Sequence, residues 1–329
     1  MRKAQVFWFP IFAFALAAQP HAVPVLGEEA SPRLQSEGSV GRICFSKDGK
    51  KLASTGGAAH LWDLSSGRLI RKWEVKGQEL AITDVAFSPD GKILVGSSMG
   101  DIVHLWNVSD GKEILKYEAK AGATRVRFHP KGNMLAVAGF GKVVSVRQMP
   151  TDKEEFLFKG GGQIYGLTFS PDGKLIAACG SEGNVHVWDY LNGKELQVLR
   201  GHKDAIYMVV FSPDGKTLAS CGGVDDRTVR IWDVGTGKQM SEFSTGKTYV
   251  RDVAFSPDGK ILACAGNDKI IRLLDPVTGQ EKQVLSCHTD EVCCVCFSPD
   301  GKLLASSSAD KTIRFWDPTS GEEVFPWSK

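Results

Sequence analysis

One phrase recurs seven times along the chain: Phe-Ser-Pro-Asp-Gly-Lys or a close variant, followed by apolar and small residues. The spacings between successive copies are 42, 41, 41, 42, 44 and 42 residues. A second phrase, best seen at residues 229–233 (Val-Arg-Ile-Trp-Asp), follows the first. Self-similarity at a period of roughly 20–50 residues indicates a repeat architecture. The leading residues of the first phrase are Phe45, Phe87, Phe128, Phe169, Phe211, Phe255 and Phe297.

Each repeat contains enough sequence for four short strands. In the fifth repeat, apolar stretches at residues 205–211 and 217–221 predict two strands, and residues 228–233 and 238–243 predict two more. Pro213-Asp214-Gly215 predicts a tight turn, with Asp-Gly expected to supply the positive φ angles. A four-stranded antiparallel meander cannot bury both of its faces alone, whereas stacking around an axis buries both. We therefore expect an all-β fold, a seven-bladed β-propeller of four-stranded antiparallel blades, over residues 31–329.

The repeat resembles the WD-repeat (Trp-Asp repeat) β-propeller family. The resemblance rests on the period, on Gly201-His202 before a strand and on Trp232-Asp233 at the end of another, and it covers residues 31–329. The third and sixth repeats depart from the pattern, with Arg147 and Leu274 at the Trp position. The aromatic residues of the other five repeats are Trp62, Trp106, Trp188, Trp232 and Trp316.

The resemblance implies a buried polar network in the better-matched repeats. It would join a His before the first strand, a Ser on the second, an Asp in the next turn and the Trp. Such a network satisfies the indole N–H and fixes the turn, so its role is structural. The residues are His202, Ser220, Asp226 and Trp232 in the fifth repeat, and His288, Ser306, Asp310 and Trp316 in the seventh.

The resemblance also implies a docking surface at the mouth of the central channel. In the family, the residue four places before the repeat Phe lines this mouth, where partners commonly dock. In repeats four to six these residues are Tyr165, Tyr207 and Arg251. Tyr249 in repeat six and Glu291 in repeat seven stand two places before the corresponding position. Tyr and Arg often anchor interfaces, so these five residues are the candidate partner-binding site. The other mouth positions are Gly41, Thr83, Thr124 and Cys293. The other residues two places before a mouth position are Ser39, Ala81, Gly122, Gln163 and Ala205.

The N-terminus has the composition of a secretory signal. Met1-Arg2-Lys3 is positively charged, residues 6–18 are apolar, and Ala15-Leu16-Ala17 has the small-x-small pattern of a cleavage site. The apolar run is shorter than the roughly 20 residues that span a bilayer, although an uncleaved anchor remains the alternative. We predict a signal peptide at residues 1–17, a linker at 18–30, and an exported protein, periplasmic or extracellular, with no other membrane span.

The charge is balanced, with a formal net charge of +2. Loss of residues 1–17 would remove Arg2 and Lys3 and no acid, which leaves basic and acidic residues equal at 38 each. A nucleic-acid-binding protein normally needs a basic face to neutralise phosphates. The composition therefore gives no support for a nucleic-acid partner.

The eight cysteines indicate packing rather than chemistry. Most stand where neighbouring repeats carry Ala, Ser or Val, and buried Cys packs as a small hydrophobe. Cys293, Cys294 and Cys296 lack paired Cys-x-x-Cys spacing, and alternation on a strand sends the first two to opposite faces. No nucleophile elbow, phosphate loop or zinc-protease motif is present. We expect no catalytic residue, no metal and no cofactor.

The sequence therefore favours a monomeric, non-enzymatic scaffold that binds one or more proteins or peptides. Two alternatives remain open: a propeller enzyme, with Glu291 and Asp84 the nearest channel carboxylates, and an envelope propeller that binds a carbohydrate or another small ligand through its aromatic residues. Two segments compete to close the ring as the last outer strand. They are residues 31–36 and residues 322–327, where Pro326 would be tolerated only at an edge.

Overall fold

The computed structural model describes residues 33–75, 81–119, 121–149, 153–246, 248–286 and 288–327. The expected signal peptide (1–17) and linker (18–30) lie outside these residues. The described chain forms seven four-stranded antiparallel sheets, which confirms the expected seven-bladed propeller. No helix in these ranges has the length and apolar character needed to cross a bilayer.

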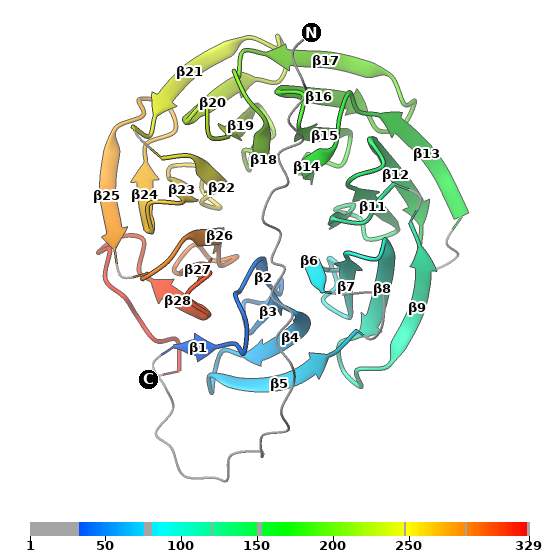
Figure 1. Ribbon diagram of the computed structural model, residues 1–329, viewed down its shortest axis with the longest axis vertical. Coiled ribbons are helices and arrows are strands. Elements are labelled where there is room, and N and C mark those ends of the chain that lie inside the picture. Colours follow the sequence, from blue (N-terminus) through cyan, green and yellow to red (C-terminus); the bar gives the residue numbers. More distant parts are fainter. Residues whose placement is uncertain are drawn as a thin grey trace, which may run out of the picture. The chain divides into compact units, whose positions relative to one another are not determined.

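The sheets are arranged around an axis, each with its first strand toward the centre (Figure 1). Blade one contains β2 (Ile43–Phe45), β3 (Lys51–Gly56), β4 (Ala58–Asp63) and β5 (Arg68–Trp73). Blade two contains β6 (Ile82–Phe87), β7 (Ile93–Ser98), β8 (Ile102–Asn107) and β9 (Glu113–Glu118). Blade three contains β10 (Arg125–Phe128), β11 (Met134–Ala138), β12 (Val143–Gln148) and β13 (Lys153–Lys159).

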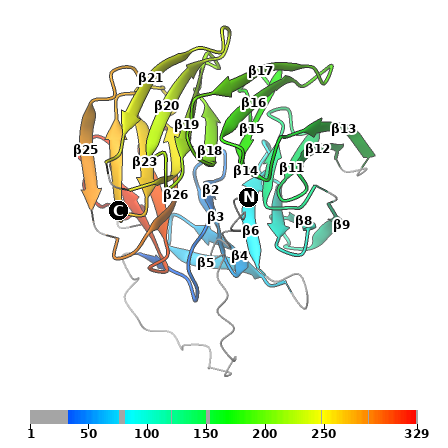
Figure 2. The same ribbon diagram turned by 45° about the horizontal axis from the view of Figure 1, so that its top comes forward.

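The later blades repeat this order, and in blade five the four strands are seen side by side in Figure 2. Blade four contains β14 (Ile164–Phe169), β15 (Leu175–Gly180), β16 (Asn184–Asp189) and β17 (Glu195–Arg200). Blade five contains β18 (Ile206–Phe211), β19 (Thr217–Gly222), β20 (Thr228–Asp233) and β21 (Gln239–Ser244). Blade six contains β22 (Val250–Phe255), β23 (Leu262–Gly266), β24 (Ile270–Leu274) and β25 (Glu281–Ser286).

Blade seven joins the two ends of the described chain. It contains β26 (Val292–Phe297), β27 (Leu304–Ser308), β28 (Thr312–Trp316) and, as its outer strand, β1 (Leu34–Gln35). Leu34 pairs with Ile313 in β28. The C-terminal candidate contributes one isolated bridge, between Glu323 and Trp316. Both competing segments thus lie along β28, and the N-terminal one forms the closing strand.

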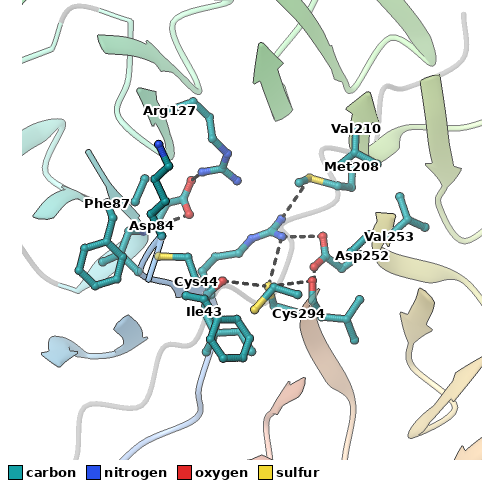
Figure 3. A pocket seen from close by; sticks show the side chains of 18 of the residues that line it. Ile43, Cys44, Asp84, Phe87, Arg127, Met208, Val210, Asp252, Val253 and Cys294 are labelled. Carbon is teal, nitrogen blue, oxygen red and sulfur yellow. Dashed lines mark hydrogen bonds and ion pairs between the residues drawn. The ribbon is translucent and has the colours of Figure 1, made fainter. Parts of the chain in front are cut away.

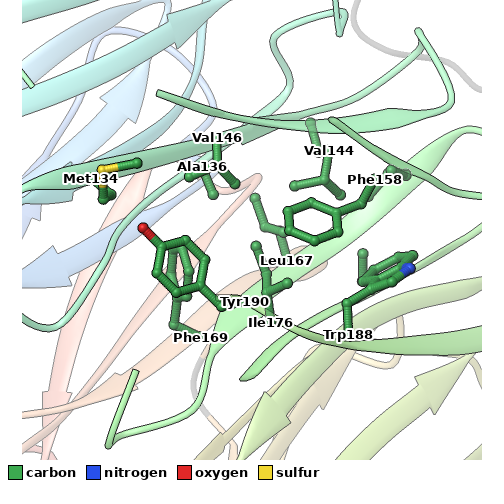
Figure 4. Close-up of a cluster of buried hydrophobic side chains, with 13 residues drawn as sticks. Met134, Ala136, Val144, Val146, Phe158, Leu167, Phe169, Ile176, Trp188 and Tyr190 are labelled. Atoms are coloured by element: carbon green, nitrogen blue, oxygen red, sulfur yellow. The ribbon is translucent and has the colours of Figure 1, made fainter. Parts of the chain in front are cut away.

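The hydrophobic core lies between neighbouring blades. One cluster joins blade three to blade four through buried side chains that include Val144, Phe158, Leu167 and Trp188 (Figure 4). Second strands such as β11 and β19 are buried along nearly their whole length, because both of their faces contact another sheet. This packing holds the inner strands as a fixed wall around the channel.

The repeat phrase forms the turn that follows each inner strand, with one difference from expectation. Gly215 has a φ of 71°, but Asp214 is not among the described residues with positive φ. The Asp214 carboxylate instead accepts hydrogen bonds from the Ser212 hydroxyl at 2.6 Å and from the Lys216 backbone N–H at 3.0 Å. The expectation that Asp also supplies a positive φ is therefore wrong. Asp acts through its side chain, and glycine alone takes the left-handed conformation.

Candidate functional site

A bulge in the inner strand sets the channel mouth. In β14, the register shifts between Ile164 and Gly166, so Tyr165 is the extra residue of a β-bulge. The same shift makes Tyr207 and Arg251 the bulged residues of β18 and β22. A bulged residue turns its side chain away from the regular alternation of the strand. The repeat therefore presents the same position at the mouth of successive blades.

Three tyrosines contact one another across blades four, five and six. The ring centroids of Tyr165 and Tyr207 are 6.2 Å apart, and those of Tyr207 and Tyr249 are 5.6 Å apart in an edge-to-face arrangement. We call Tyr165, Tyr207 and Tyr249 the tyrosine arc. All three side chains are partly exposed. The arc is a continuous aromatic surface built from three successive blades.

Polar bonds fix both ends of the tyrosine arc. Tyr249 donates a hydrogen bond to Glu291 Oε1 at 3.0 Å, and Arg251 Nη1 lies 2.7 Å from the same oxygen. At the other end, Tyr165 donates to Gln163 Oε1 at 3.0 Å. The structure thus brings together all five residues of the candidate site, from Tyr165 on blade four to Glu291 on blade seven.

The ionisation of the site follows from partial burial and from nearby carboxylates. Burial, then the charge of Glu291, raises the pKa of Tyr249 to about 12. Burial and the charge of Asp204 raise the pKa values of Tyr165 and Tyr207. Although burial opposes it, attraction from the Glu291 carboxylate raises the pKa of Arg251. At neutral pH the tyrosines are neutral hydrogen-bonding groups and the arginine is charged.

The remaining mouth positions have small side chains or none. Thr83 and Thr124 donate to backbone carbonyls, and Cys293 is 4% exposed. A Cβ at Gly41 would lie 2.9 Å from the Thr55 hydroxyl, so the glycine lets β2 approach its neighbour closely. The aromatic part of the mouth is therefore on blades four to six.

The two expected polar networks are present as hydrogen-bonded chains. In blade five, Trp232 Nε1 donates to Ser220 Oγ at 2.8 Å, His202 Nε2 lies 2.7 Å from the same hydroxyl, and His202 Nδ1 lies 2.9 Å from Asp226. The corresponding distances in blade seven, among Trp316, Ser306, His288 and Asp310, are each 2.8 Å. Each chain of hydrogen bonds links the second strand of its blade to the turn before the third strand.

The inner strands also place buried ion pairs inside the channel, which the sequence analysis missed apart from noting Asp84. Arg42 Nη1 lies 2.7 Å from Asp252 Oδ1, and Arg127 Nη1 lies 2.7 Å from Asp84 Oδ2. Figure 3 shows Asp84 and Arg127 on one wall and Met208 and Asp252 on the opposite wall. The available signal was the residue three places before the repeat Phe, which is charged in blades one, two, three and six and uncharged in the others.

These pairs surround a cavity of about 370 Å³. Its lining includes Phe45, Lys47 and Pro89, which lie where inner strands end, so this lower cavity is at the opposite end of the strands from the tyrosine arc. Its carboxylates, Asp84 and Asp252, are each about 1% exposed and already bound to arginine. Across the described ranges, no group of three or more His, Cys, Asp or Glu side chains is placed to hold a metal ion.

The cysteines lie where packing predicts them. Cys179 and Cys221 occupy the same place on the second strands of blades four and five and are at most 2% exposed. Burial raises the pKa of Cys44 to about 12 and that of Cys293 to about 11, which keeps these thiols protonated. Cys287 lies outside the described residues.

Five segments of the chain match the family model described as WD domain, G-beta repeat. They are residues 67–107, 153–189, 193–233, 237–275 and 279–317, together more than half of the chain. The chain belongs to the WD-repeat family. Each matched segment begins at or near an outer strand and ends with the third strand of the following blade, so the WD repeat is offset by one strand from the structural blade.

WD-repeat propellers are typically non-enzymatic scaffolds that bind proteins or peptides. The third WD repeat of this chain, which has Arg147 in place of Trp, lies outside the matched segments. There, Arg147 lies over the ring of Tyr117, with its guanidinium carbon 4.7 Å from the centroid. A search of curated proteins found no match to the chain.

Proposed function

We propose that this propeller is a non-enzymatic scaffold that holds a protein or peptide partner at the channel mouth. The observation that carries the proposal is the tyrosine arc together with the Arg251–Glu291 pair. Aromatic rings with polar edges anchor interfaces because they bury a large area at a small cost in conformational entropy. The rigid inner strands fix these groups before a partner arrives, which reduces the ordering cost of binding.

The channel chemistry supports a binding role over catalysis. A hydrolytic or proton-transfer site needs carboxyl or imidazole groups that converge on open space. Asp84, Asp252 and Glu291 are each held by an arginine within 2.7 Å. The five residues at the mouth are instead suited to contact, since they combine aromatic area with one fixed ion pair.

The test compares three forms of the purified full-length chain. The parent is set beside a mouth variant, Tyr165→Ala with Tyr207→Ala and Arg251→Ala, and a rim control, Leu196→Ala with Met240→Ala and Val284→Ala. The control side chains are exposed on outer strands by 43%, 59% and 46%. Proteins captured from an extract by the parent are then purified and titrated against all three forms.

The mouth variant is expected to bind the partner at least about a hundredfold more weakly than the parent, since anchor residues contribute about 2 kcal/mol each. The rim control should bind as the parent does. Equal affinity for all three forms would show that the partner does not bind at these mouth residues. A signal for the parent on a glycan array, with no protein captured, would instead favour the carbohydrate-binding alternative.

We propose further that the protein is exported as a monomer after loss of residues 1–17. This rests on the charge, apolar run and small-x-small pattern of the N-terminus. N-terminal sequencing of the protein from cell fractions tests it, with Ala18 expected as the first residue in the exported fraction. Light scattering gives the oligomeric state. A protein that retains Met1 and stays with the cell interior would overturn the proposal.

A further inference from the structure

Two aspartates stand at equivalent places beside the tyrosine arc, in blades five and seven. Asp204 and Asp290 each lie seven residues before the repeat Phe and two residues after the histidine of the polar network. The loop that holds each one leads directly into the inner strand, β18 or β26. Asp204 is three residues before Tyr207, and Asp290 is next to Glu291, so both belong to the channel mouth.

The two aspartates are fixed by backbone hydrogen bonds and stay accessible. Asp204 Oδ2 accepts the backbone N–H of Asp225 at 3.0 Å, and Asp290 Oδ1 accepts that of Glu291 at 2.8 Å. Asp290 is exposed and Asp204 is partly exposed. Within the described ranges, neither carboxylate forms an ion pair with a lysine or arginine of the chain. Each therefore carries a full negative charge toward solvent.

Negative charge from the mouth carboxylates reaches the aromatic rings. After burial, the charge of Asp204 is the next cause that raises the pKa values of Tyr165 and Tyr207. The charge of Glu291 acts in the same way on Tyr249. Such shifts require the carboxylates to lie near the phenol groups. The rings of the arc therefore lie in a region of negative potential.

The nearby cations are held by acceptors of the protein itself. Arg251 Nη1 lies 2.7 Å from Glu291, and Arg125 Nη1 donates to the Thr124 carbonyl at 2.8 Å. The charge of Arg251 opposes the carboxylates at two of the three tyrosines, but it is the weaker effect. The arc thus combines partly exposed aromatic rings with accessible carboxylates on blades five and seven.

We propose that the partner docks a basic segment, with lysine or arginine side chains, against the tyrosine arc between Asp204 and Asp290. A cation is attracted to the face of an aromatic ring, and its aliphatic stem packs on apolar surface. The two aspartates add ion pairs at the edge of the contact, whereas an acidic segment would be repelled. This inference rests on the proposed function and specifies the chemistry of the partner.

The experiment measures the binding of two fluorescently labelled peptides to the full-length chain by anisotropy. One is a glycine–serine peptide that carries several arginines. The other carries citrulline at the same places, which is nearly isosteric and uncharged. The parent is compared with Asp204→Asn, Asp290→Asn and with the control Asp110→Asn, Glu322→Gln. The control acids are exposed in turns that follow a third strand, so the same charge is removed outside the mouth.

The parent should bind the arginine peptide at least about tenfold more tightly than the citrulline peptide, because each guanidinium gains ring contacts and a carboxylate. Asp204→Asn, Asp290→Asn should lose most of this preference, and the control variant should keep it. Asparagine retains an acceptor oxygen for the backbone N–H in each loop, so this variant should fold. Added salt should weaken the preference of the parent, since exposed charges are screened.

Equal or undetectable binding of the two peptides by the parent overturns the inference. A preference that survives unchanged in Asp204→Asn, Asp290→Asn also overturns it. Either result leaves the proposed function standing, because that is decided by the affinity of the mouth variant for the captured partner. If that affinity equals the parent's, the proposed function fails whatever the peptides show.

Discussion

A single hydroxyl group organises the interior of blade five. Ser220 Oγ accepts the indole N–H of Trp232 and lies within hydrogen-bond distance of His202, which in turn contacts Asp226. All four side chains are buried, so none can find water if the chain of bonds is broken. The hydroxyl thus holds two large rings from different segments of the blade in register.

Replacing this hydroxyl should therefore be costly. We expect Ser220→Ala to lower the free energy of unfolding by about 1–3 kcal/mol, because it leaves Trp232 and His202 with unsatisfied groups. Ser241, on the outer strand of the same blade, has a buried hydroxyl with no partner. Ser241→Ala should change stability by less than about 0.5 kcal/mol. Urea unfolding measures both; equal losses would contradict a special role for Ser220.

Residue-level prediction from the sequence succeeded where the repeat itself carried the information. The repeat phrase located every inner strand, and the family pattern predicted the contact between His202 and Asp226. It did not give the pairing of Arg42 with Asp252, since these residues are 210 positions apart and meet across the channel. A sequence pattern that describes one blade at a time cannot predict contacts between side chains of different blades across the channel.

At the scale of the element, a strand of only two residues, β1, closes the ring. β1 has two residues, too few to show alternation, which is why residues 31–36 and 322–327 could not be separated in advance. Its position is set by Leu34, which is 2% exposed and packs with Ile43 and Phe315. Arg33 adds an ion pair to Glu323 at 3.0 Å, so the two chain ends support each other.

The closing strand can be tested with two neighbouring residues. Leu34→Ala should lower the free energy of unfolding by about 2–4 kcal/mol, as expected for a buried leucine whose cavity refills poorly. Gln35 is exposed on the same strand, so Gln35→Ala should cost less than about 0.5 kcal/mol. Chemical unfolding followed by tryptophan fluorescence compares them. If both variants unfold like the parent, the C-terminal segment closes the ring instead.

Over the whole molecule, the repeat places an aspartate with a lowered pKa in the same turn of six blades. Hydrogen bonds from a serine hydroxyl and from backbone N–H groups lower the pKa of a turn aspartate in six of the blades, as at Asp214. In the two polar networks, bonds from His, Thr and backbone overcome burial and lower the pKa values of Asp226 and Asp310 well below the ordinary range. The six turn residues are Asp48, Asp90, Asp172, Asp214, Asp258 and Asp300.

This arrangement predicts the acid response of the propeller. A carboxyl group whose pKa is lower in the folded state stabilises the fold above its unfolded pKa of about 3.9, and this contribution is lost as the pH falls through the folded pKa. The Tm should therefore be level from pH 7 to pH 5 and fall by at least about 5 °C from pH 5 to pH 3. Asp226→Asn should have a lower Tm at pH 7 and a shallower fall. A Tm unchanged down to pH 3 would contradict this account.

The ring closure has a consequence for how the protein is made. Arg33 meets Glu323 across 290 positions, so the first strand to leave the ribosome is the last to find its place. Six blades can form in order during synthesis, but Leu34 cannot pair until β28 has been synthesised. Until then the open edge of β28 can pair with the first strand of another copy, so a monomer requires that closure within the chain outpaces exchange between chains.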